Sequence, residues 1–331
     1  MNLQIVFPLL TVLVLGMVAY VGGTSGGLQS VFGIIIPYAA VIIFIAGVVK
    51  KVLGWLKSPV PFRIPTTCGQ QKSLPWIEQN KIDNPSDKKG VVLRMLFEVL
   101  LFRSLFRNTK NSIKEGRLVF ELEIWLWLFG LIFHYSFFTV LVRHFRFFLE
   151  PVPGLLKMVE ALDGFLQIGL PGVLMSGVLL LGAACYLLAR RLTIPQVKYI
   201  SLAADYFPLF LIIGIAGTGI FMRYVSHVDI TVIKELTMGL VTFSPVIPAG
   251  VSAVFYIHLF FVSVLLAYFP FSKLMHAGGV FLSPTRNLPN DSRMKRHINP
   301  WNPKLKFVTY EDYENEFREK MIEAGLPVEK E

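Results

Sequence analysis

The chain has 331 residues, of which 54% are hydrophobic and only 16% are charged, and its formal net charge is +10. Soluble globular domains are about 25% charged, so this composition excludes an ordinary soluble domain and predicts an integral membrane protein. The two cysteines are too few to hold an iron–sulfur cluster within this chain alone.

Apolar runs of membrane length recur along the chain. A helix needs about 20 mainly apolar residues to cross the hydrocarbon core. Six such runs occur, at 3–22, 31–49, 122–142, 166–189, 206–222 and 245–269. The first run lacks a basic leader and a clear cleavage site, so we expect it to be retained. The predicted fold class is therefore an all-α integral membrane protein with a six-helix transmembrane bundle.

The basic residues are concentrated in alternate connections. Residues 50–117 hold fourteen Lys and Arg against five Asp and Glu, and the turn around Arg190 and the tail at 293–296 are also basic. Positively charged loops tend to stay in the cytoplasm. We therefore expect a multi-pass protein of the cell membrane with both termini cytoplasmic. The charge also indicates affinity for anionic lipid, and it does not indicate nucleic-acid binding.

This pattern divides the chain into four expected regions. They are two N-terminal transmembrane helices (1–49), a basic cytoplasmic loop (50–120), a four-helix domain (121–276) and a cytoplasmic tail (277–331). In the loop, charged residues interrupt the apolar stretch 91–108 at spacings that predict an amphipathic helix in the membrane interface. The tail ends in "TYEDYENEFREKMIEAG", a predicted polar helix, and is too small for a large core, so we expect it to dock on a partner.

Four histidines belong to the predicted membrane domain. His134 and His144 lie in the third run and His258 lies in the sixth. His276 follows shortly after and would be the cytoplasmic end of the sixth helix if that helix continues past Pro270. Ionisable groups at membrane depth are costly and usually functional, and neutral imidazole is a strong ligand for iron.

Helix geometry predicts which of these histidines meet. His258 and His276 are eighteen residues apart, which is five turns and about 27 Å of a continuous helix, whereas His134 and His144 are about 15 Å apart. The third helix runs outward and the sixth runs inward. The expected pairs are therefore an outer one, His144 with His258, and an inner one, His134 with His276. The unequal rises require tilt, a bend near Pro270 or upright macrocycles.

Two functions fit these pairs. Opposed imidazoles are what a six-coordinate haem iron needs, and such an iron serves electron transfer rather than oxygen chemistry. A proton-coupled transporter could use the same residues as a relay. Against the transporter, the helices lack paired Gly- or Pro-broken segments in symmetry-related positions. Spacing alone leaves both functions open.

The spacing of the histidines and several short motifs resemble those of known protein families. The His-x9-His spacing followed by a His-x17-His that ends in "PFSKLMH" resembles the di-haem cytochrome b of the respiratory nitrate reductase gamma-subunit family, over about residues 121–280. The additional N-terminal helix, "PFRIPTTCGQQKSLPWI" at 61–77 and "SPTRN" at 283–287 resemble the DsrM family, the membrane cytochromes of DsrMKJOP complexes in dissimilatory sulfur (sulfite/sulfate) metabolism.

The resemblance implies cofactors and partners. His144 and His258 would ligate the outer of two b haems, and His134 and His276 the inner one. Menaquinone would be the exchangeable membrane substrate. The electron partner would be a cytoplasmic iron–sulfur subunit of the heterodisulfide-reductase type, within a complex that has other membrane and outer-side redox subunits. The chain would then be an electron-transfer subunit of a quinone-linked oxidoreductase.

Further residues are assigned by analogy. The quinone site should lie beside the outer haem, where Lys157, Arg143 and Arg146 could position a quinone carbonyl. The alternative for each is ordinary interfacial snorkelling. Arg223 could pair with a haem propionate, since a planar guanidinium suits carboxylates, or it could be a snorkelling helix end.

The remaining histidines and cysteines have a simpler interpretation. His227 and His297 have no partner at matching depth, so we expect solvated or locally hydrogen-bonded side chains. Cys68 falls in the cytoplasmic loop and Cys185 inside the fourth span, so we expect no disulfide between them.

Overall fold

Six membrane-length helices form the body of the protein. The computed structural model describes residues 3–58, 60, 71–164, 172–293, 304 and 306–329. Within these residues six helices are long and apolar enough to cross a bilayer, namely Leu3–Thr24, Val31–Leu56, Ile124–Phe147, Met175–Thr193, Ala203–Tyr224 and Ala253–Phe271. The prediction of six spans is confirmed, and it fits a multi-pass membrane protein.

Three of the spans combine a helix with a short turn of different pitch. In chain order the membrane helices are α1 (Leu3–Thr24), α2 (Ile36–Leu56, after a π-helical turn Val31–Ile35), α5 (Ile124–His144, before a 3-10 turn Phe145–Phe147), α7 (Met175–Thr193), α9 (Ala203–Tyr224) and α11 (Ala253–Tyr268, before a 3-10 turn Phe269–Phe271). The other elements are α3 (Lys88–Leu101), α4 (Arg103–Phe106), β1 (Thr109–Lys114), β2 (Arg117–Leu122), α6 (Gly154–Asp163), α8 (Pro195–Ile200), α10 (Ile230–Val241), a 3-10 turn Lys273–Met275, α12 (His276–Gly279) and α13 (Tyr310–Glu323).

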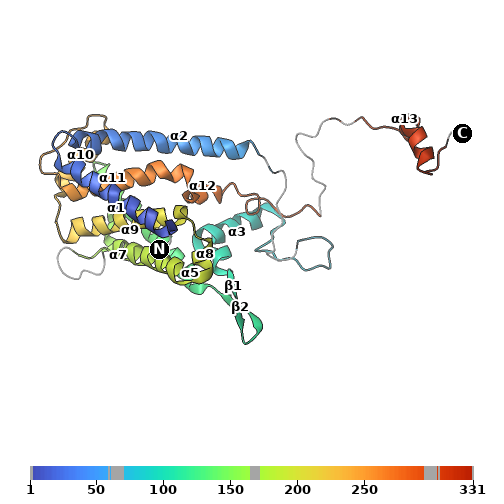
Figure 1. Ribbon diagram of the computed structural model, residues 1–331, viewed down its shortest axis with the longest axis horizontal. Coiled ribbons are helices and arrows are strands. Elements are labelled where there is room, and N and C mark those ends of the chain that lie inside the picture. Colours follow the sequence, from blue (N-terminus) through green and yellow to red (C-terminus); the bar gives the residue numbers. More distant parts are fainter. Residues whose placement is uncertain are drawn as a thin grey trace.

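The membrane helices pack as neighbours in a bundle (Figure 1). α5 packs on α7, α7 on α9, α9 on α1 and α11, and α11 also on α1 and α2. Leu211 and Phe261 are buried where α9, α11 and α1 meet. Small residues allow this approach: a Cβ atom at Gly23 would lie 2.7 Å from the Cβ of Tyr256. Large apolar side chains such as Leu13 and Met17 of α1 remain exposed, as expected of a lipid-facing surface.

Two spans begin later in the chain than predicted. The sixth starts at Ala253 rather than at 245. Pro245 and Pro248 cannot donate backbone hydrogen bonds, Gly250 has a φ of +87°, and the Ser252 side chain caps the helix by accepting from the N–H of Phe255. The fourth span was predicted from 166, but α7 begins at Met175, and residues 172–174 are not helical.

The two longer connections at the predicted outer end contain helices. The 150–165 connection forms α6, and the 223–244 connection forms α10, which is capped by the Asp229 carboxylate accepting from the N–H of Thr231 at 2.8 Å. Both helices are too short to cross a bilayer, so a search for membrane-length runs passes over them. In Figure 1, α10 lies at the end of the bundle away from α3.

A two-stranded hairpin corrects the all-α expectation. β1 and β2 pair antiparallel, with Ile113 opposite Leu118 and Asn111 opposite Phe120. The strands are joined by Glu115 and Gly116, both with positive φ (51° and 75°). Positive φ at both central residues is typical of the tight turns that match the twist of a hairpin. The hairpin projects from the bundle beside α3 (Figure 1).

The helix α3 is amphipathic, and its polar side is the buried one. Arg94 and Glu98 are buried, whereas Leu93, Leu96 and Leu100 are exposed. In a soluble protein the opposite arrangement would be expected. The exposed apolar side therefore needs a covering that is not provided by the described part of the chain.

The predicted helix of the tail is present as α13. It begins after Thr309, whose hydroxyl accepts from the N–H of Asp312 at 3.1 Å. Several residues named in the sequence analysis lie outside the described part of the chain, among them Cys68, His297 and residues 61–70 of the 61–77 motif.

Candidate functional site

Two pairs of histidines face each other between α5 and the chain that begins with α11. The ring centroids of His134 and His276 are 5.8 Å apart, with their planes at 81°. Those of His144 and His258 are 6.2 Å apart, with their planes at 16°. The structure thus brings together the histidines that the sequence analysis paired by their expected depth in the membrane. We call them the inner pair (His134 and His276) and the outer pair (His144 and His258), after the predicted orientation.

The helix that carries His258 does not continue to His276. α11 ends at Tyr268, Pro270 lies in a 3-10 turn, and a second such turn precedes α12, which begins at His276. Proline lacks a backbone donor and disfavours helix at the residue before it. A continuous helix of five turns between His258 and His276 is therefore not formed. The chain bends near Pro270, which was one of the expected ways to absorb the unequal spacing.

Hydrogen bonds define the tautomer of three of the histidines. Nδ1 of His134 donates to the carbonyl oxygen of Gly130 at 2.7 Å, and Nδ1 of His144 donates to that of Val140 at 2.6 Å. Nδ1 of His276 donates in the same way to the Lys273 carbonyl at 2.8 Å. A carbonyl oxygen can only accept, so the proton sits on Nδ1 and Nε2 keeps its lone pair. Metal-ligating histidines usually show this arrangement.

The fourth histidine, His258, has the same tautomer, which is defined by its contact with Thr218. The Thr218 hydroxyl on α9 is 2.7 Å from the carbonyl oxygen of Gly214, to which it donates, and 2.9 Å from Nδ1 of His258. Because the hydroxyl proton goes to the carbonyl, the oxygen accepts from Nδ1–H of His258. Nε2 of His258 is therefore also left with its lone pair.

The geometry of the pairs fits a metal held in a macrocycle. An imidazole nitrogen binds a metal at about 2 Å, so two rings that share one ion through opposed Nε2 atoms have centroids about 6 Å apart. Within the described residues, no group of three or more His, Cys, Asp or Glu could hold a metal ion. The other ligands would have to come from a cofactor, and a b-type haem needs only two axial side chains.

The inner pair lies near α3 and α4. The Phe102 ring meets His134 edge-on at a centroid distance of 4.9 Å, and the centroid of the Phe133 ring lies 5.2 Å from that of His134. Both His134 and His276 are exposed in the protein alone. The inner pair is thus open to whatever covers this end of the bundle.

The outer pair lies where α5 ends and α11 begins. His144 and His258 are both half-buried, and the Phe147 ring lies 5.8 Å from His144. A Cβ atom at Gly219 would lie 3.4 Å from the His258 ring, in van der Waals contact, so α9 passes directly beside this ring. The outer pair is therefore enclosed by helices of the bundle itself.

Arg223 lies on α9 five residues after Thr218. One guanidinium nitrogen is 3.4 Å from the Gly172 carbonyl, and its Nε is buried without a hydrogen-bond partner among the described residues. A buried unpaired donor on the helix that orients His258 fits an acceptor that the protein does not supply. A haem propionate has the required charge and hydrogen-bonding groups.

Arg143, expected at the quinone, forms a buried ion pair. Its guanidinium contacts the Asp163 carboxylate at 2.5 Å and the Ser176 hydroxyl at 3.0 Å. Asp163 also accepts from the Ser176 N–H at 2.7 Å. These contacts tie α6 and the start of α7 to the end of α5. Nε of Arg143 stays buried without a partner in the described residues.

The other two residues expected at the quinone lie beside α6. Arg146 pairs with Glu160 of α6, and Lys157 is exposed on the same helix. The structure thus gathers Arg143, Arg146 and Lys157 around α6, near the outer pair.

Sequence reasoning missed the partners of these groups. The partners are Thr218, Asp163 and Glu160, and each contacts a residue that the sequence analysis named. None of the three lies in a recognisable motif. Thr218 sits in "GIAGTGIF", where a hydroxyl among small residues of a membrane helix is the one available signal. The acidic pair could be noticed only once α6 is known to be a helix.

The remaining singled-out residues behave simply. His227 is exposed between α9 and α10, with its Nδ1 3.1 Å from the Val225 carbonyl, as a locally hydrogen-bonded side chain should be. Cys185 is a free, exposed cysteine on α7.

Comparison with known proteins adds family information. The model of the nitrate reductase gamma subunit family matches residues 118–291. An "Hdr-like menaquinol oxidoreductase cytochrome b-like subunit" of Archaeoglobus fulgidus is 45% identical over 285 residues, covering 82% of this chain and 84% of that protein. A protein of the same description from Archaeoglobus profundus is 43% identical over 275 residues, covering 81% and 82%. The resemblance inferred from the histidine spacing is confirmed.

Proposed function

The chain belongs to the nitrate reductase gamma-subunit family, and from this we propose that it is the di-haem cytochrome b subunit of a membrane-bound menaquinol oxidoreductase complex. The names of the relatives support a role in membrane electron transfer. One observation carries the haem assignment. Two opposed histidine pairs lie at the ring spacing of a shared metal, and all four rings present Nε2.

The protein would hold two b haems through its own side chains. His144 and His258 would ligate one, and His134 and His276 the other. When bound, haem supplies one-electron transfer. The hydrogen bonds at Nδ1 would keep each Nε2 available to the iron, and two histidine ligands for each haem would suit electron transfer rather than oxygen chemistry.

Menaquinol would react near the outer pair. The ion pair between Arg143 at the end of α5 and Asp163 of α6 supports this, because it holds α6 near His144. Arg146 and Lys157 would orient a quinone carbonyl, Arg143 would keep α6 against α5 through Asp163, and Arg223 would pair with a propionate. Glu160, next to Arg146, could accept a proton and pass it to the outer water.

The opposite end of the bundle would meet the electron partner. Its basic residues would face the cytoplasm together with both termini. The exposed apolar side of α3 would lie in the interface of the cell membrane. The tail (277–331) would dock on a cytoplasmic iron–sulfur subunit of the heterodisulfide-reductase type, in a complex with further redox subunits. The likeness of "SPTRN" to the DsrM family supports a place in dissimilatory sulfur metabolism.

An absorption spectrum of the purified protein tests this function directly. Dithionite reduction should sharpen α and Soret bands typical of bis-histidine b haem, and a haemochrome assay should give two haems for each chain. A well-folded but colourless protein would refute the proposal and favour the proton-coupled transporter.

The quinone site needs a separate experiment. A menaquinol analogue added to the intact complex should reduce the haem, and Lys157→Ala should weaken the apparent affinity for that analogue. The exposed Lys89→Ala, far from α6 in the chain, is the matched control. Haem that stays oxidised in the presence of the analogue would contradict the assignment.

A further inference from the structure

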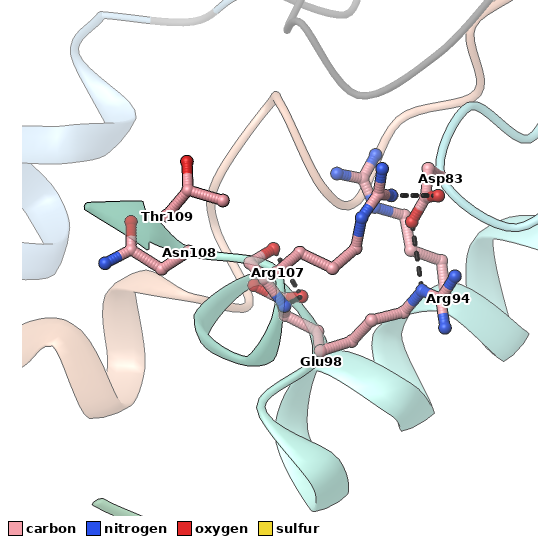
Figure 2. Close-up of a pocket in the computed structure, with 8 residues that line it drawn as sticks. Asp83, Arg94, Glu98, Arg107, Asn108 and Thr109 are labelled. Atoms are coloured by element: carbon pink, nitrogen blue, oxygen red, sulfur yellow. Dashed lines mark hydrogen bonds and ion pairs between the residues drawn. The ribbon is translucent and has the colours of Figure 1, made fainter. Parts of the chain in front are cut away.

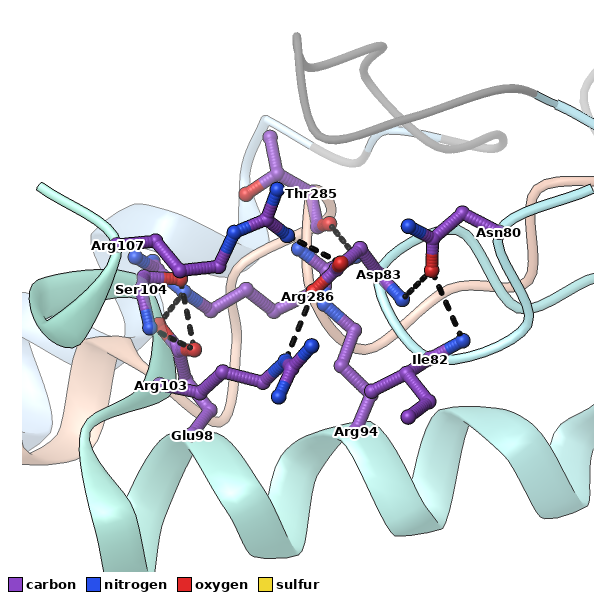
Figure 3. A network of polar contacts seen from close by, with 10 residues as sticks. All are labelled: Asn80, Ile82, Asp83, Arg94, Glu98, Arg103, Ser104, Arg107, Thr285 and Arg286. Carbon is purple, nitrogen blue, oxygen red and sulfur yellow. Dashed lines mark hydrogen bonds and ion pairs between the residues drawn. The ribbon is translucent and has the colours of Figure 1, made fainter.

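A network of charged residues joins two segments that lie far apart in the sequence (Figure 3). One segment is residues 80–107, which includes α3 and α4, and the other is residues 283–290, which follow α12. We call the network the clamp, and its side chains are Asp83, Arg94, Glu98, Arg103, Ser104, Arg107 and Arg286.

Glu98 is the centre of the clamp. One carboxylate oxygen accepts from Nε of Arg286 at 2.7 Å. The other accepts from the Ser104 N–H at 3.1 Å and from its hydroxyl at 2.7 Å. The Glu98 side chain is only 8% exposed. A buried carboxylate whose oxygens are both satisfied holds its partners strongly, because removing one leaves an uncompensated charge.

Further contacts join the same two segments. Arg94, which is buried, donates to the Thr285 carbonyl at 3.0 Å. The Asn290 N–H donates to the Pro85 carbonyl at 2.7 Å. Asp83 pairs with both Arg103 and Arg107, which joins the chain before α3 to the chain after it.

The clamp lies beside a cavity of about 270 Å³, which Asp83, Arg94, Glu98, Arg103 and Arg107 line (Figure 2). The lining comes from residues 83–109, so the cavity belongs to the α3 side of the clamp. The contacts described above from this side to residues 283–290 are an ion pair and hydrogen bonds.

Both segments that the clamp joins are connected to the inner pair, one by contact with α5 and the other along the chain. The end of α3 is hydrogen-bonded to α5. The Trp127 indole donates to the Leu101 carbonyl at 2.7 Å, and the Tyr135 hydroxyl donates to the Leu100 carbonyl at 3.0 Å. The Phe102 ring lies against the His134 ring. The other segment follows α12, so that Arg286 lies ten residues after His276 in the chain. The clamp is thus a bridge between the elements that carry the two inner rings.

We propose that Glu98 is a positioning residue for the inner pair, acting through its ion pair with Arg286. His276 is exposed and sits on a four-residue helix outside the membrane spans, so short local structure alone cannot hold its ring opposite His134. The ion pair supplies the missing constraint from α3. The inference rests on the proposed haem function for its consequence, but not for the clamp itself.

The test compares Glu98→Gln, Arg286→Gln and the double variant in the full chain. Glutamine preserves the shape of Glu98 and its bonds to Ser104, so only the ion pair is lost. Glu121→Gln is the matched control, because it removes a carboxylate from the Lys110 ion pair on the hairpin at the same end of the bundle. If one ion pair is responsible, the double variant should be no worse than either single variant.

Two measurements distinguish an effect on the clamp from an effect on haem binding. Hydrogen exchange of residues 280–290 should accelerate in both single variants and not in Glu121→Gln, whether or not haem is bound. In the haem-loaded protein, the inner haem should dissociate about tenfold more readily and titrate at a shifted potential, since groups beyond the ligands typically have such effects. The outer haem, which should keep its potential, reports that the bundle is folded.

The outcomes are distinguishable. Unchanged hydrogen exchange in Arg286→Gln, which alters only the peripheral segment, would overturn the role of the ion pair even if Glu98→Gln failed to fold. Hydrogen exchange could become faster while the dissociation and potential of the two haems stay unchanged, or while both haems change equally. Either result would overturn the link between the clamp and the inner pair. A wild-type protein without haem would refute the proposed function, and hydrogen exchange of residues 280–290 would still support or overturn the clamp.

Discussion

The two histidine pairs are similar in spacing but are built in different ways. The outer pair is carried by two membrane helices, α5 and α11, and its rings are half-buried among bundle side chains. The inner pair joins the middle of α5 to a short helix beyond the bend at Pro270, and both of its rings are exposed. Helices that pack in a bundle position a ligand by themselves, whereas a ligand outside the bundle needs polar contacts from elsewhere in the chain.

The largest expected effect follows from removing one ligand of each pair. His276→Ala should abolish the inner haem and His258→Ala the outer one, each lowering the haem content by about half, because a bis-histidine site needs both axial ligands. A haemochrome assay with a redox titration checks this. His227→Ala, at an exposed loop histidine, should lose nothing. Loss of neither haem in the two site variants would reject the pairing.

A smaller effect is expected where a single hydrogen bond orients an outer ring. Thr218→Val removes the hydroxyl that accepts from Nδ1 of His258. The outer haem should then dissociate about tenfold more readily and shift in potential, while the inner haem is unchanged. Thr218→Ser retains the hydroxyl and should behave as wild type. Equal behaviour of the Val and Ser variants would show that the hydrogen bond does not matter.

The two pairs should also differ in the wild-type protein. Imidazole planes at 16° in the outer pair and 81° in the inner pair impose different symmetry on the iron orbitals. Low-spin electron paramagnetic resonance should show a rhombic signal from the outer haem and a strongly anisotropic signal, with one dominant low-field feature, from the inner haem. Two superimposable rhombic signals would contradict the difference in ring orientation.

The smallest expected effect concerns the pH dependence of the clamp. Burial alone would raise the pKa of the Asp83 carboxyl, but hydrogen bonds from Arg103 and Arg107 and their charges lower it below the ordinary value of 3.8. A carboxyl with a lowered pKa stabilises the fold at pH values above its ordinary pKa, and this stabilisation is lost as the pH falls through the lowered pKa of the folded state.

Asp83→Asn should therefore cost on the order of 1 kcal/mol near neutral pH, because its two arginine partners are one-third to one-half exposed. The cost should shrink as the pH falls below about 4 and should be lost once the pH lies below the lowered pKa of Asp83 in the folded protein. Thermal unfolding in detergent at several pH values measures it. A difference between variant and wild type that stays constant from neutral pH down to about pH 2 would exclude the ion pairs as its source.

The sequence by itself determined the features that depend on local composition. Runs of apolar residues indicated six spans, because a helix must satisfy its backbone inside lipid and cover the hydrocarbon thickness. Histidine spacing and span direction matched His144 with His258 and His134 with His276. Polar and Pro-containing stretches marked the loop and the tail, and the family resemblance followed from the same histidines.

Tertiary structure decided the bend after α11 and the polar contacts between segments that are distant in the chain. Pro270 signals a bend, but the direction of the chain after it is set by contacts such as Arg286 with Glu98, 188 residues apart. The hydroxyl of Thr218 and the carboxylate of Asp163 acquire roles only when α9 and α6 bring them to His258 and Arg143. Hydrogen bonds and ion pairs act over a few ångströms in space, and no motif or spacing in the sequence marked these polar partners as groups that would meet.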